Sequence, residues 1–262
     1  MKVAASRATE NLIGFMTILR REYDRIIRIW GQTLVPPAMT STLYFIIFGG
    51  LIGARVGSFD GIPYMQFIAP GLIMMAVITT SYGNVVSSFF GAKFGKHIEE
   101  LLVAPLPPSL ILLGYLGGGL IRGLLVGALV TVVTLLFTHI RVDHPWLVVA
   151  SVVLTSLTFA LGGFINAVFA KTFDQINWFP TFVLTPLTYF GGVFYSITVL
   201  PGWAQSLSHA NPVLYMVNTF RYGFYSRSDV NLTVAWSLMV ATVGVLFALA
   251  YVLLKRGTGV RD

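Results

Sequence analysis

The residues that could carry out catalysis are few and widely separated. His97, His139, His144 and His209 show no paired spacing of the kind that metal ligands have. The chain has no cysteine, so a thiolate metal site and a disulfide framework are both impossible. The long apolar segments contain no Asp, Glu, Lys or His, so neither a proton relay nor an intramembrane hydrolase or transferase is indicated. The sequence therefore predicts no catalytic residue, no metal site and no cofactor in this chain.

One short motif invites comparison with a phosphate-binding loop. Residues 91–96 read GAKFGK, with three residues between the glycines where such a loop needs four. His97 stands where the loop needs the Ser or Thr that binds Mg²⁺. The motif also follows an apolar segment and not a strand. The chain therefore has no visible energy source of its own.

Arg122 is the one charged residue well inside a long apolar segment. Its burial costs a few kcal/mol or more unless it finds a partner or water, so it must face the protein interior. Two roles remain open: contact with an anionic substrate, or pairing with backbone carbonyls or a neighbouring hydroxyl. The surrounding glycines permit close helix approach, within one chain or between two copies. They are Gly114, Gly118, Gly119, Gly123 and Gly127.

The composition predicts that the elements holding these residues lie mainly in a lipid bilayer and not in water. Only 10% of the 262 residues are charged and 56% are hydrophobic, far from the usual balance of a soluble chain. Several runs reach the ~20 apolar residues that a helix needs to cross a bilayer. We predict an all-α polytopic membrane protein with six transmembrane helices: Thr33 to Gly53, Tyr64 to Phe90, Leu110 to Thr138, Pro145 to Ala170, Trp178 to Tyr195 and Leu232 to Leu254.

The basic residues predict the orientation of these spans. Twelve of the 17 Lys and Arg residues fall on the side that holds both termini, four fall on the other side, and Arg122 lies within a span. By the positive-inside rule, both termini are cytoplasmic. The net charge of +7 is therefore explained by basic residues at the ends of the spans, where they set the orientation and are attracted to anionic lipid. No nucleic-acid partner is expected.

Two segments outside the spans have a recognisable pattern. Residues 9–31 predict an amphipathic interfacial helix, lying in the membrane surface or else packed on a soluble neighbour. Its apolar side comprises Leu12, Met16, Leu19, Tyr23, Ile26 and Trp30. Residues 196–231 are too apolar for a free loop, yet prolines and polar residues break them before they could cross the bilayer. We predict an external re-entrant hairpin packed against other spans, with an amphipathic surface loop as the alternative.

Three stretches together resemble the ABC-2 type permease family, the membrane subunits of ATP-binding-cassette exporters. They are KFGKHIEELLVAPLPPS from residue 93, LTPLTYFGGVFYSITVLP from residue 184 and NPVLYMVNTFRYG from residue 211. LVPPAMTSTLYFIIFG and YMQFIAPGLIMM are similar to the YadH-like group of that family. The resemblance covers essentially the whole chain, and Val213 is a mild departure from the family pattern.

The resemblance implies one ABC-2 type transmembrane domain over residues 1–262, in a bacterial inner-membrane, multi-pass half-transporter that homodimerises. It implies two copies of a cytosolic ATPase subunit, which bind the ATP and Mg²⁺. Residues 9–31 would be the connecting helix. The coupling helix that inserts into the ATPase would comprise Lys96, His97, Ile98, Glu99, Glu100, Leu101, Leu102 and Val103. The external re-entrant motif would include Pro201, Asn211, Pro212, Tyr215 and Arg221.

The leading hypothesis is therefore an exporter permease for an amphipathic or lipid-like substrate. A stand-alone secondary transporter or channel-like protein remains the alternative. A membrane-bound transferase is a third possibility, but it lacks the carboxylates that it would need. Ile98, Leu101 and Leu102 are expected to give the coupling helix an apolar contact face, with Glu99 and Glu100 offering charge to a basic partner.

Overall fold

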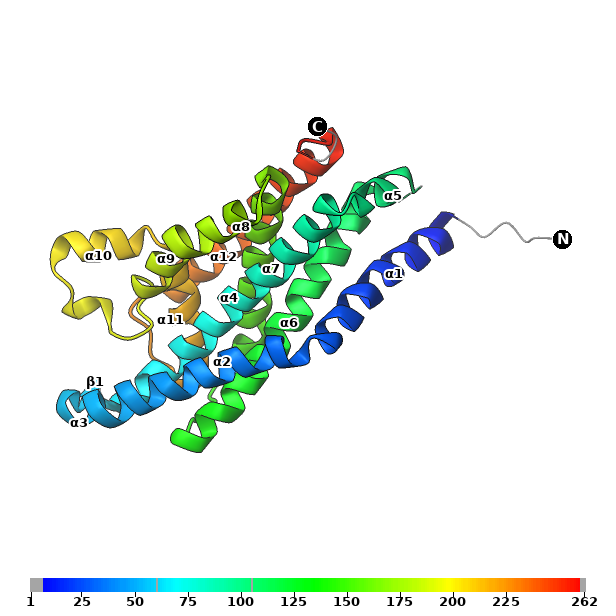
Figure 1. Cartoon of the computed structure of the whole chain (residues 1–262). Helices are drawn as coiled ribbons and strands as arrows, with labels where there is room; N and C mark the ends of the chain where they lie inside the picture. The colour runs from blue at the N-terminus through cyan, green and yellow to red at the C-terminus, as the bar shows by residue number, and fades with distance from the viewer. Residues whose placement is uncertain (1–6, 60, 105, 260–262) are drawn as a thin grey trace.

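The computed structural model describes residues 7–59, 61–104 and 106–259, and these form mostly helices (Figure 1). The N-terminal half contains α1 (Arg7–Arg28), α2 (Trp30–Tyr44), the π-helix η1 (Phe45–Ile52), α3 (Gly53–Val56), α4 (Tyr64–Phe94), α5 (His97–Val103) and α6 (Pro108–Phe137). The C-terminal half contains α7 (Pro145–Phe169), α8 (Phe173–Phe179), the π-helix η2 (Pro180–Leu184), α9 (Thr185–Tyr189), the short 3₁₀ turn η3 (Ile197–Val199), α10 (Gly202–His209), α11 (Pro212–Tyr225) and α12 (Leu232–Arg256). Strands β1 (Ser58–Phe59) and β2 (Ile62–Pro63) pair antiparallel, with Ser58 opposite Pro63.

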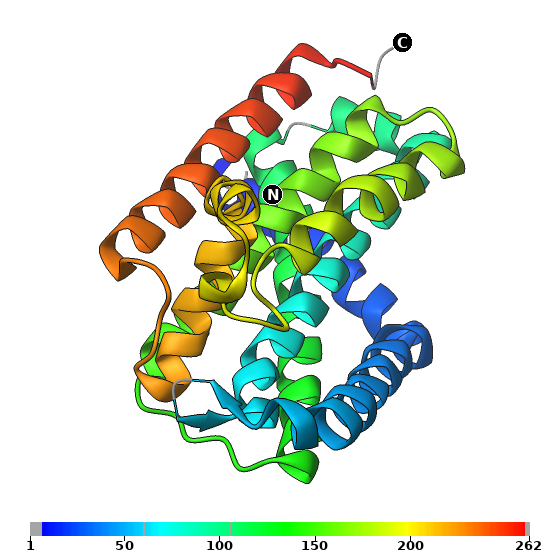
Figure 2. The same cartoon turned by 90° about the vertical axis from the view of Figure 1, so that its left-hand side faces the viewer.

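Helix α4 occupies the centre of the bundle and packs mainly against α6 and α7. It is buried on nearly every side, because α2, α6, α7 and α11 all contact it. Figure 2 shows α2 and α12 at opposite edges of the bundle. A helix that is apolar all round and surrounded in this way belongs to the interior of a membrane bundle. The core therefore consists of α4 and the faces of α6 and α7 that enclose it.

Five helical segments of the described chain are long and apolar enough to cross a membrane: Trp30–Gly50, Tyr64–Phe94, Pro108–Phe137, Pro145–Phe169 and Leu232–Arg256. They correspond to five of the six predicted spans. The remaining expected span, Trp178 to Tyr195, is helical only in three consecutive pieces, α8, η2 and α9. The prediction of a mostly helical protein with several membrane-spanning helices is confirmed. The sixth crossing stays a prediction.

Pro180 accounts for the irregularity of that segment. Proline has no N–H, so the Ile176 carbonyl loses the donor that an α-helix would provide four residues later. Asn166 of α7 supplies a replacement, since its Nδ2 donates to the Ile176 carbonyl (3.3 Å) and to the Tyr82 hydroxyl (2.6 Å). The π-helix η2 begins at this proline. This continuous but irregular helical segment is thus bonded to α7 through Asn166, which also donates to Tyr82 of α4.

The glycines of α6 mediate packing within the chain. Gly114 and Gly118 face Ile18 and Glu22 of α1. On the other side of the helix, Gly119 faces Ala160 and Val85, Gly123 faces Ser81 and Ser156, and Gly127 faces Val77. The sequence left open whether these glycines pack within one chain or between two copies. The structure shows that all five positions pack within the chain.

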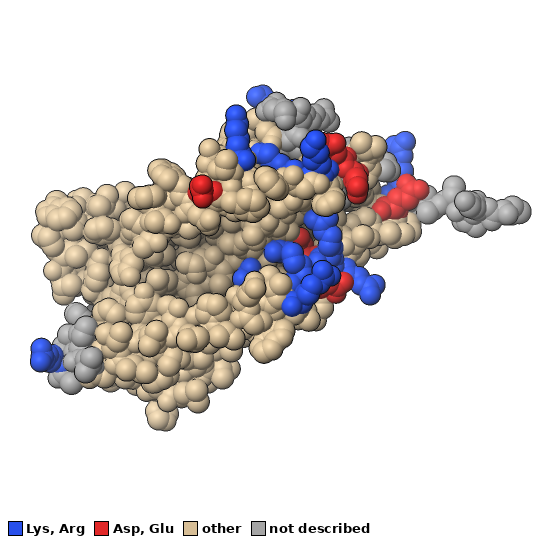
Figure 3. All heavy atoms as spheres, viewed as in Figure 1, with Lys and Arg blue, Asp and Glu red and all other residues tan. Residues whose placement is uncertain are grey.

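The two ends of the bundle differ in charge. In Figure 1, α5, the start of α1 and the C-terminus lie at one end, while α3, β1 and α10 lie toward the other. Figure 3 shows most of the visible Lys, Arg, Asp and Glu gathered at the first end. This arrangement agrees with an even number of crossings, and the side of the membrane on which this end lies stays a prediction.

Candidate functional site

Helix α5 is a short element held directly between two of the long helices. It follows α4 after a tight turn in which Lys96 adopts a left-handed conformation (φ 58°), and Ala104 to Pro107 lead from it into α6. Glu99, Glu100 and His97 are exposed, and Val103 is 86% exposed. These groups are accessible at the surface of the described chain. The chain between α4 and α6 thus forms a compact helical projection.

The expectation for the apolar face of α5 is wrong at Ile98. Its side chain is only 1% exposed and joins the hydrophobic core, so it anchors α5 to this chain and is not free to contact a partner. The helical backbone includes Leu101 and Leu102, whose side chains lie outside the described part of the structure. The exposed apolar group of α5 that the structure does describe is Val103.

Lys93 fastens the end of α4 to the end of α7, which the sequence did not indicate. Its Nζ donates to the carbonyls of Val168 (2.7 Å) and Ala170 (2.8 Å), with a longer contact to Ala167 (3.5 Å). These are the last carbonyls of α7, where the helix dipole favours a cation. The segment next to α5 is therefore joined to a second long helix.

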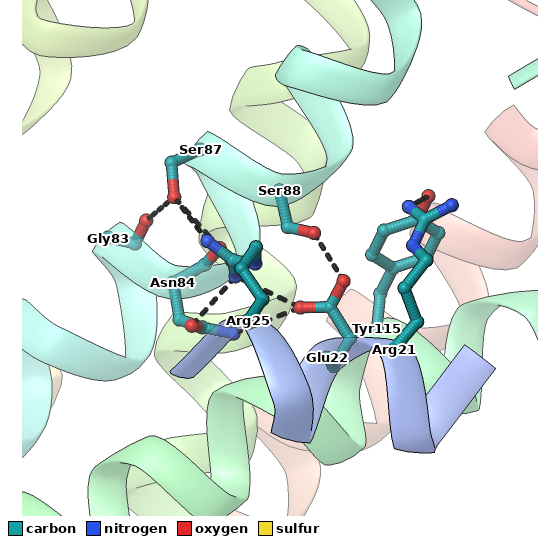
Figure 4. A network of polar contacts seen from close by, with 8 residues as sticks. All are labelled: Arg21, Glu22, Arg25, Gly83, Asn84, Ser87, Ser88 and Tyr115. Carbon is teal, nitrogen blue, oxygen red and sulfur yellow. Dashed lines mark hydrogen bonds and ion pairs between the residues drawn. The ribbon is translucent and has the colours of Figure 1, made fainter. Parts of the chain in front are cut away.

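A buried carboxylate joins α1 to α4 (Figure 4). Glu22 is fully buried and accepts hydrogen bonds from Ser88 Oγ and Asn84 Nδ2 (3.4 Å). Arg25 pairs with Glu22 (2.9 Å) and also donates to the Asn84 side-chain oxygen (2.8 Å) and carbonyl (3.0 Å). Arg21 donates to the Tyr115 hydroxyl of α6 (3.1 Å). We call Glu22, Arg25, Asn84 and Ser88 the α1–α4 network.

This network changes the interpretation of the amphipathic helix. The side of α1 that faces the bundle carries Ile18, Glu22 and Ile26. From the predicted apolar side, Leu12, Met16, Tyr23 and Trp30 are exposed, which agrees with a side turned toward lipid, whereas Ile26 is buried. At 3.6 residues per turn, the buried stripe lies about 80° around the helix from the predicted apolar side. The helix thus docks on α4 and α6 through one face and presents an apolar second face outward, free to contact lipid or another chain.

Arg122 borders a cavity of ≈ 410 Å³ between α2, α4 and α6. Residues from Gln32 to Tyr44 of α2 form one wall, residues from Leu72 to Gly83 of α4 form the other, and Arg122 comes from near the middle of α6. The Nε atom of Arg122 is buried and has no hydrogen-bond partner among the described residues. The inward orientation predicted for this residue agrees with its position on the cavity.

The residues of the predicted external motif are brought together around α11. Asn211 caps this helix by accepting from the Val213 amide (2.9 Å), and it donates to the Leu187 carbonyl (2.6 Å). Pro212 occupies the first turn of the helix, where a missing N–H costs nothing. Tyr215 donates to the His209 carbonyl (2.9 Å), and Pro201 precedes α10.

Arg221 holds the same region from inside. It is buried, donates to the Gly192 carbonyl (2.7 Å) and lies over the Phe67 ring at 4.0 Å from its centroid. The motif therefore secures α11 against α4, α7 and α12, and α10 contacts α11 and η3. These contacts suit a structural role. Whether the pair enters the membrane stays a prediction.

Comparison with known proteins places the chain in a family. Residues 14–225 match the family model described as ABC-2 type transporter. The chain is 55% identical over 251 residues to the inner membrane transport permease YadH of Escherichia coli strain K12, covering 95% of this chain and 98% of that relative. It is 26% identical over 249 residues to nodulation protein J of Sinorhizobium fredii strain NBRC 101917 / NGR234, covering 93% of both.

The chain belongs to the ABC-2 type transporter family. The resemblance seen in the sequence, including its YadH-like character, is confirmed. Together with the five apolar helices, the match defines a multi-pass membrane transport protein. In the described residues, no group of three His, Asp or Glu side chains gathers as a metal site would require.

Proposed function

We propose that this chain is the membrane-spanning permease of an ATP-binding-cassette exporter in the bacterial inner membrane. It moves an amphipathic or lipid-like substrate outward, and the ATP and Mg²⁺ bind to a separate cytosolic ATPase present in two copies. Both termini and α5 lie in the cytoplasm, six segments cross the bilayer, and α10 and α11 form the external re-entrant hairpin. The inner membrane permease YadH, similar over nearly the whole chain, supports the location.

The observation that carries this proposal is the way in which α5 is mounted. A seven-residue helix with two exposed carboxylates projects between the long helices α4 and α6. Ile98 ties it to the core, and Lys93 ties the adjoining end of α4 to α7. A push on α5 would therefore be transmitted to three long helices, which is what a separate motor subunit requires.

The number of proposed crossings supports a homodimer. Six crossings are half the usual complement of an exporter, and one copy would leave a translocation path open to lipid along one side. Exposed apolar side chains on α2, such as Val35 and Met39, and on α6, such as Val132 and Leu136, suit lipid or a second copy.

The decisive experiment compares charge reversal on α5 and on α8. Both are seven-residue helices with an exposed acid in the first turn, Glu100 and Asp174. We expect Glu100→Arg to abolish transport and to lower ATPase co-purification at least tenfold, since loss of an interface hot spot costs about 2 kcal/mol or more. Asp174→Arg should retain both. Native mass spectrometry should show the permease still dimeric in each variant.

The outcome also separates the alternatives. If Glu100→Arg retains full ATPase binding and transport, or if only Asp174→Arg is damaging, the coupling role of α5 is refuted. If the permease transports its substrate with no ATPase present, the stand-alone transporter is correct. The exporter proposal requires that transport be lost when the phosphate-binding lysine of the ATPase is replaced.

A further inference from the structure

We propose that the cavity between α2, α4 and α6 binds the negatively charged head group of an amphipathic ligand, with Arg122 as the cation that recognises it. The term Arg122 site is used below for this cavity and the polar groups on its wall. The identification of this ligand as the transported substrate rests on the function proposed above. The binding of the ligand does not depend on that function.

The first argument is the charge balance of the cavity wall. Arg122 is the one charged residue among the residues that line the cavity, and they include no acid. The nearby carboxylate of Glu22 is already engaged by Ser88, Asn84 and Arg25. A cation at membrane depth without a protein partner is costly, and an anion that enters the cavity removes that cost. The unmatched charge therefore selects for an anionic ligand.

The second argument is a buried hydroxyl on the same wall. Thr33 is fully buried, lines the cavity, and its Oγ1 has no hydrogen-bond partner within the described chain. A buried hydroxyl without a partner is unfavourable, so a ligand that accepts from it is stabilised. Together with the guanidinium of Arg122, it offers hydrogen-bond donors from two helices. Such a pair suits the oxygens of a phosphate or carboxylate, which accept from several donors at once.

The third argument is the polarity of the cavity along its length. Helices α2 and α4 run in opposite directions, so Gln32 and Thr33 of α2 lie at the same end as Gly83 of α4. At the opposite end, Leu72 and Met75 of α4 stand across from hydroxyl-bearing residues of α2, which are Thr40, Ser41 and Tyr44. The end with Gln32 and Gly83 is the one nearer α5 and the charged end of the bundle (Figure 1). The wall thus matches a molecule whose head points toward that end and whose apolar chain follows α4 away from it.

The fourth argument is size. A volume of ≈ 410 Å³ lies in the range of sites that hold drug-sized molecules, about 300–1,000 Å³. This is more than a free inorganic anion needs. Met75, Ala76 and Pro36 provide apolar wall beyond the end with Gln32 and Gly83. The observations therefore favour an anionic group carried on an apolar chain over free phosphate.

The experiment measures direct binding to the purified permease without the ATPase, in a neutral maltoside detergent. The probe is radiolabelled dodecyl phosphate, with dodecyl trimethylammonium and inorganic phosphate as unlabelled competitors. We expect dodecyl phosphate to bind, Arg122→Gln to weaken it at least tenfold, and Arg122→Lys to recover part of the loss. The control is Arg141→Gln, which removes an exposed arginine paired with Asp143 and should leave binding unchanged.

Three results would overturn the proposal. Dodecyl phosphate could bind Arg122→Gln as tightly as the unchanged protein, the trimethylammonium compound could compete as well as the phosphate, or inorganic phosphate alone could displace the probe at equal concentration. The last result would identify a free-anion site. Since no ATPase is present, these results do not depend on the coupling role of α5. Conversely, Arg122→Gln should still co-purify with the ATPase.

Discussion

At the scale of single residues, the α1–α4 network and an exposed ion pair on the same helix allow a matched comparison. Glu22 is fully buried and bonded to Arg25, Asn84 and Ser88. Asp24, two residues later, pairs with Arg20 at 3.9 Å on the exposed side of α1. One turn of α1 therefore carries two carboxylates, one buried and one exposed.

We expect Glu22→Ala to destabilise the protein and Asp24→Ala to have almost no effect. Removal of one partner from a buried ion pair costs about 3–5 kcal/mol, and partial exposure of Arg25 reduces this to about 2–3 kcal/mol. The exposed pair should contribute under about 1 kcal/mol. Thermal unfolding in detergent measures both. Equal midpoints for the two variants would mean that the buried network does not hold α1.

The sequence singled out Arg122 as an interior charge but gave no sign of the buried Glu22. A lone arginine in an apolar run has few options, so its inward orientation follows from the cost of exposing charge to lipid. Glu22 stands among Arg20, Arg21 and Arg25, where a glutamate is usually solvated. Its partners Asn84 and Ser88 are about 60 residues away, on a helix whose rotation is fixed only by packing. A pattern within one helix could not reveal them.

At the scale of elements, the contact between α4 and α7 depends on one glycine. A Cβ atom on Gly163 would lie 2.6 Å from the Tyr82 carbonyl oxygen, closer than real Cβ atoms come. Its neighbour Gly162 has room for a Cβ atom, with the nearest atom of Tyr82 at an ordinary contact distance of 4.0 Å. Since backbone cannot move aside as a flexible side chain does, the two positions should respond differently to the same substitution.

We expect Gly163→Ala to destabilise the protein by about 1–3 kcal/mol, because the α4 and α7 backbones must move apart. Gly162→Ala should be neutral or stabilising, because alanine has a better helix propensity than glycine by about 1 kcal/mol. The midpoint of thermal unfolding in detergent again provides the measurement. A Gly163→Ala protein as stable as Gly162→Ala would show that the two helices pack less closely than described.

The elements themselves were predictable to different degrees. Long uniform apolar runs predicted five helices, because a helix satisfies every amide within its own segment, whereas barrel strands alternate apolar and polar residues. The segment Trp178 to Tyr195 was apolar enough, but its helix turns π-helical at Pro180 and ends at Tyr189. The helix breakers within residues 196–231 indicated short, separate elements, and α10 and α11 are two such helices. Whether they form an external re-entrant hairpin stays a prediction. What a single sequence could not provide was the side of α1 that packs, since both of its faces carry apolar residues.

At the scale of the whole molecule, the predicted orientation can be tested by labelling, because the chain contains no natural cysteine. Ser58 of β1 and Lys171 before α8 are both exposed and lie near opposite ends of the bundle. We expect Ser58→Cys to react with a membrane-impermeant maleimide added to spheroplasts. Lys171→Cys should react only after the membrane is opened. The reverse pattern would place the termini and α5 outside and would contradict the proposed ATPase contact.

The two prolines of α2 also affect the molecule as a whole. Pro36 and Pro37 stand within this helix and border the Arg122 site. Neither has an N–H, so the carbonyls of Gln32 and Thr33 lack their usual helical donors one turn earlier. With two successive rungs of its hydrogen-bond ladder missing, α2 bends there at lower cost than an unbroken helix would. The cavity thus has one compliant wall, and a bulky molecule could widen it by flexing a single helix while α4, α6 and α7 remain a rigid frame.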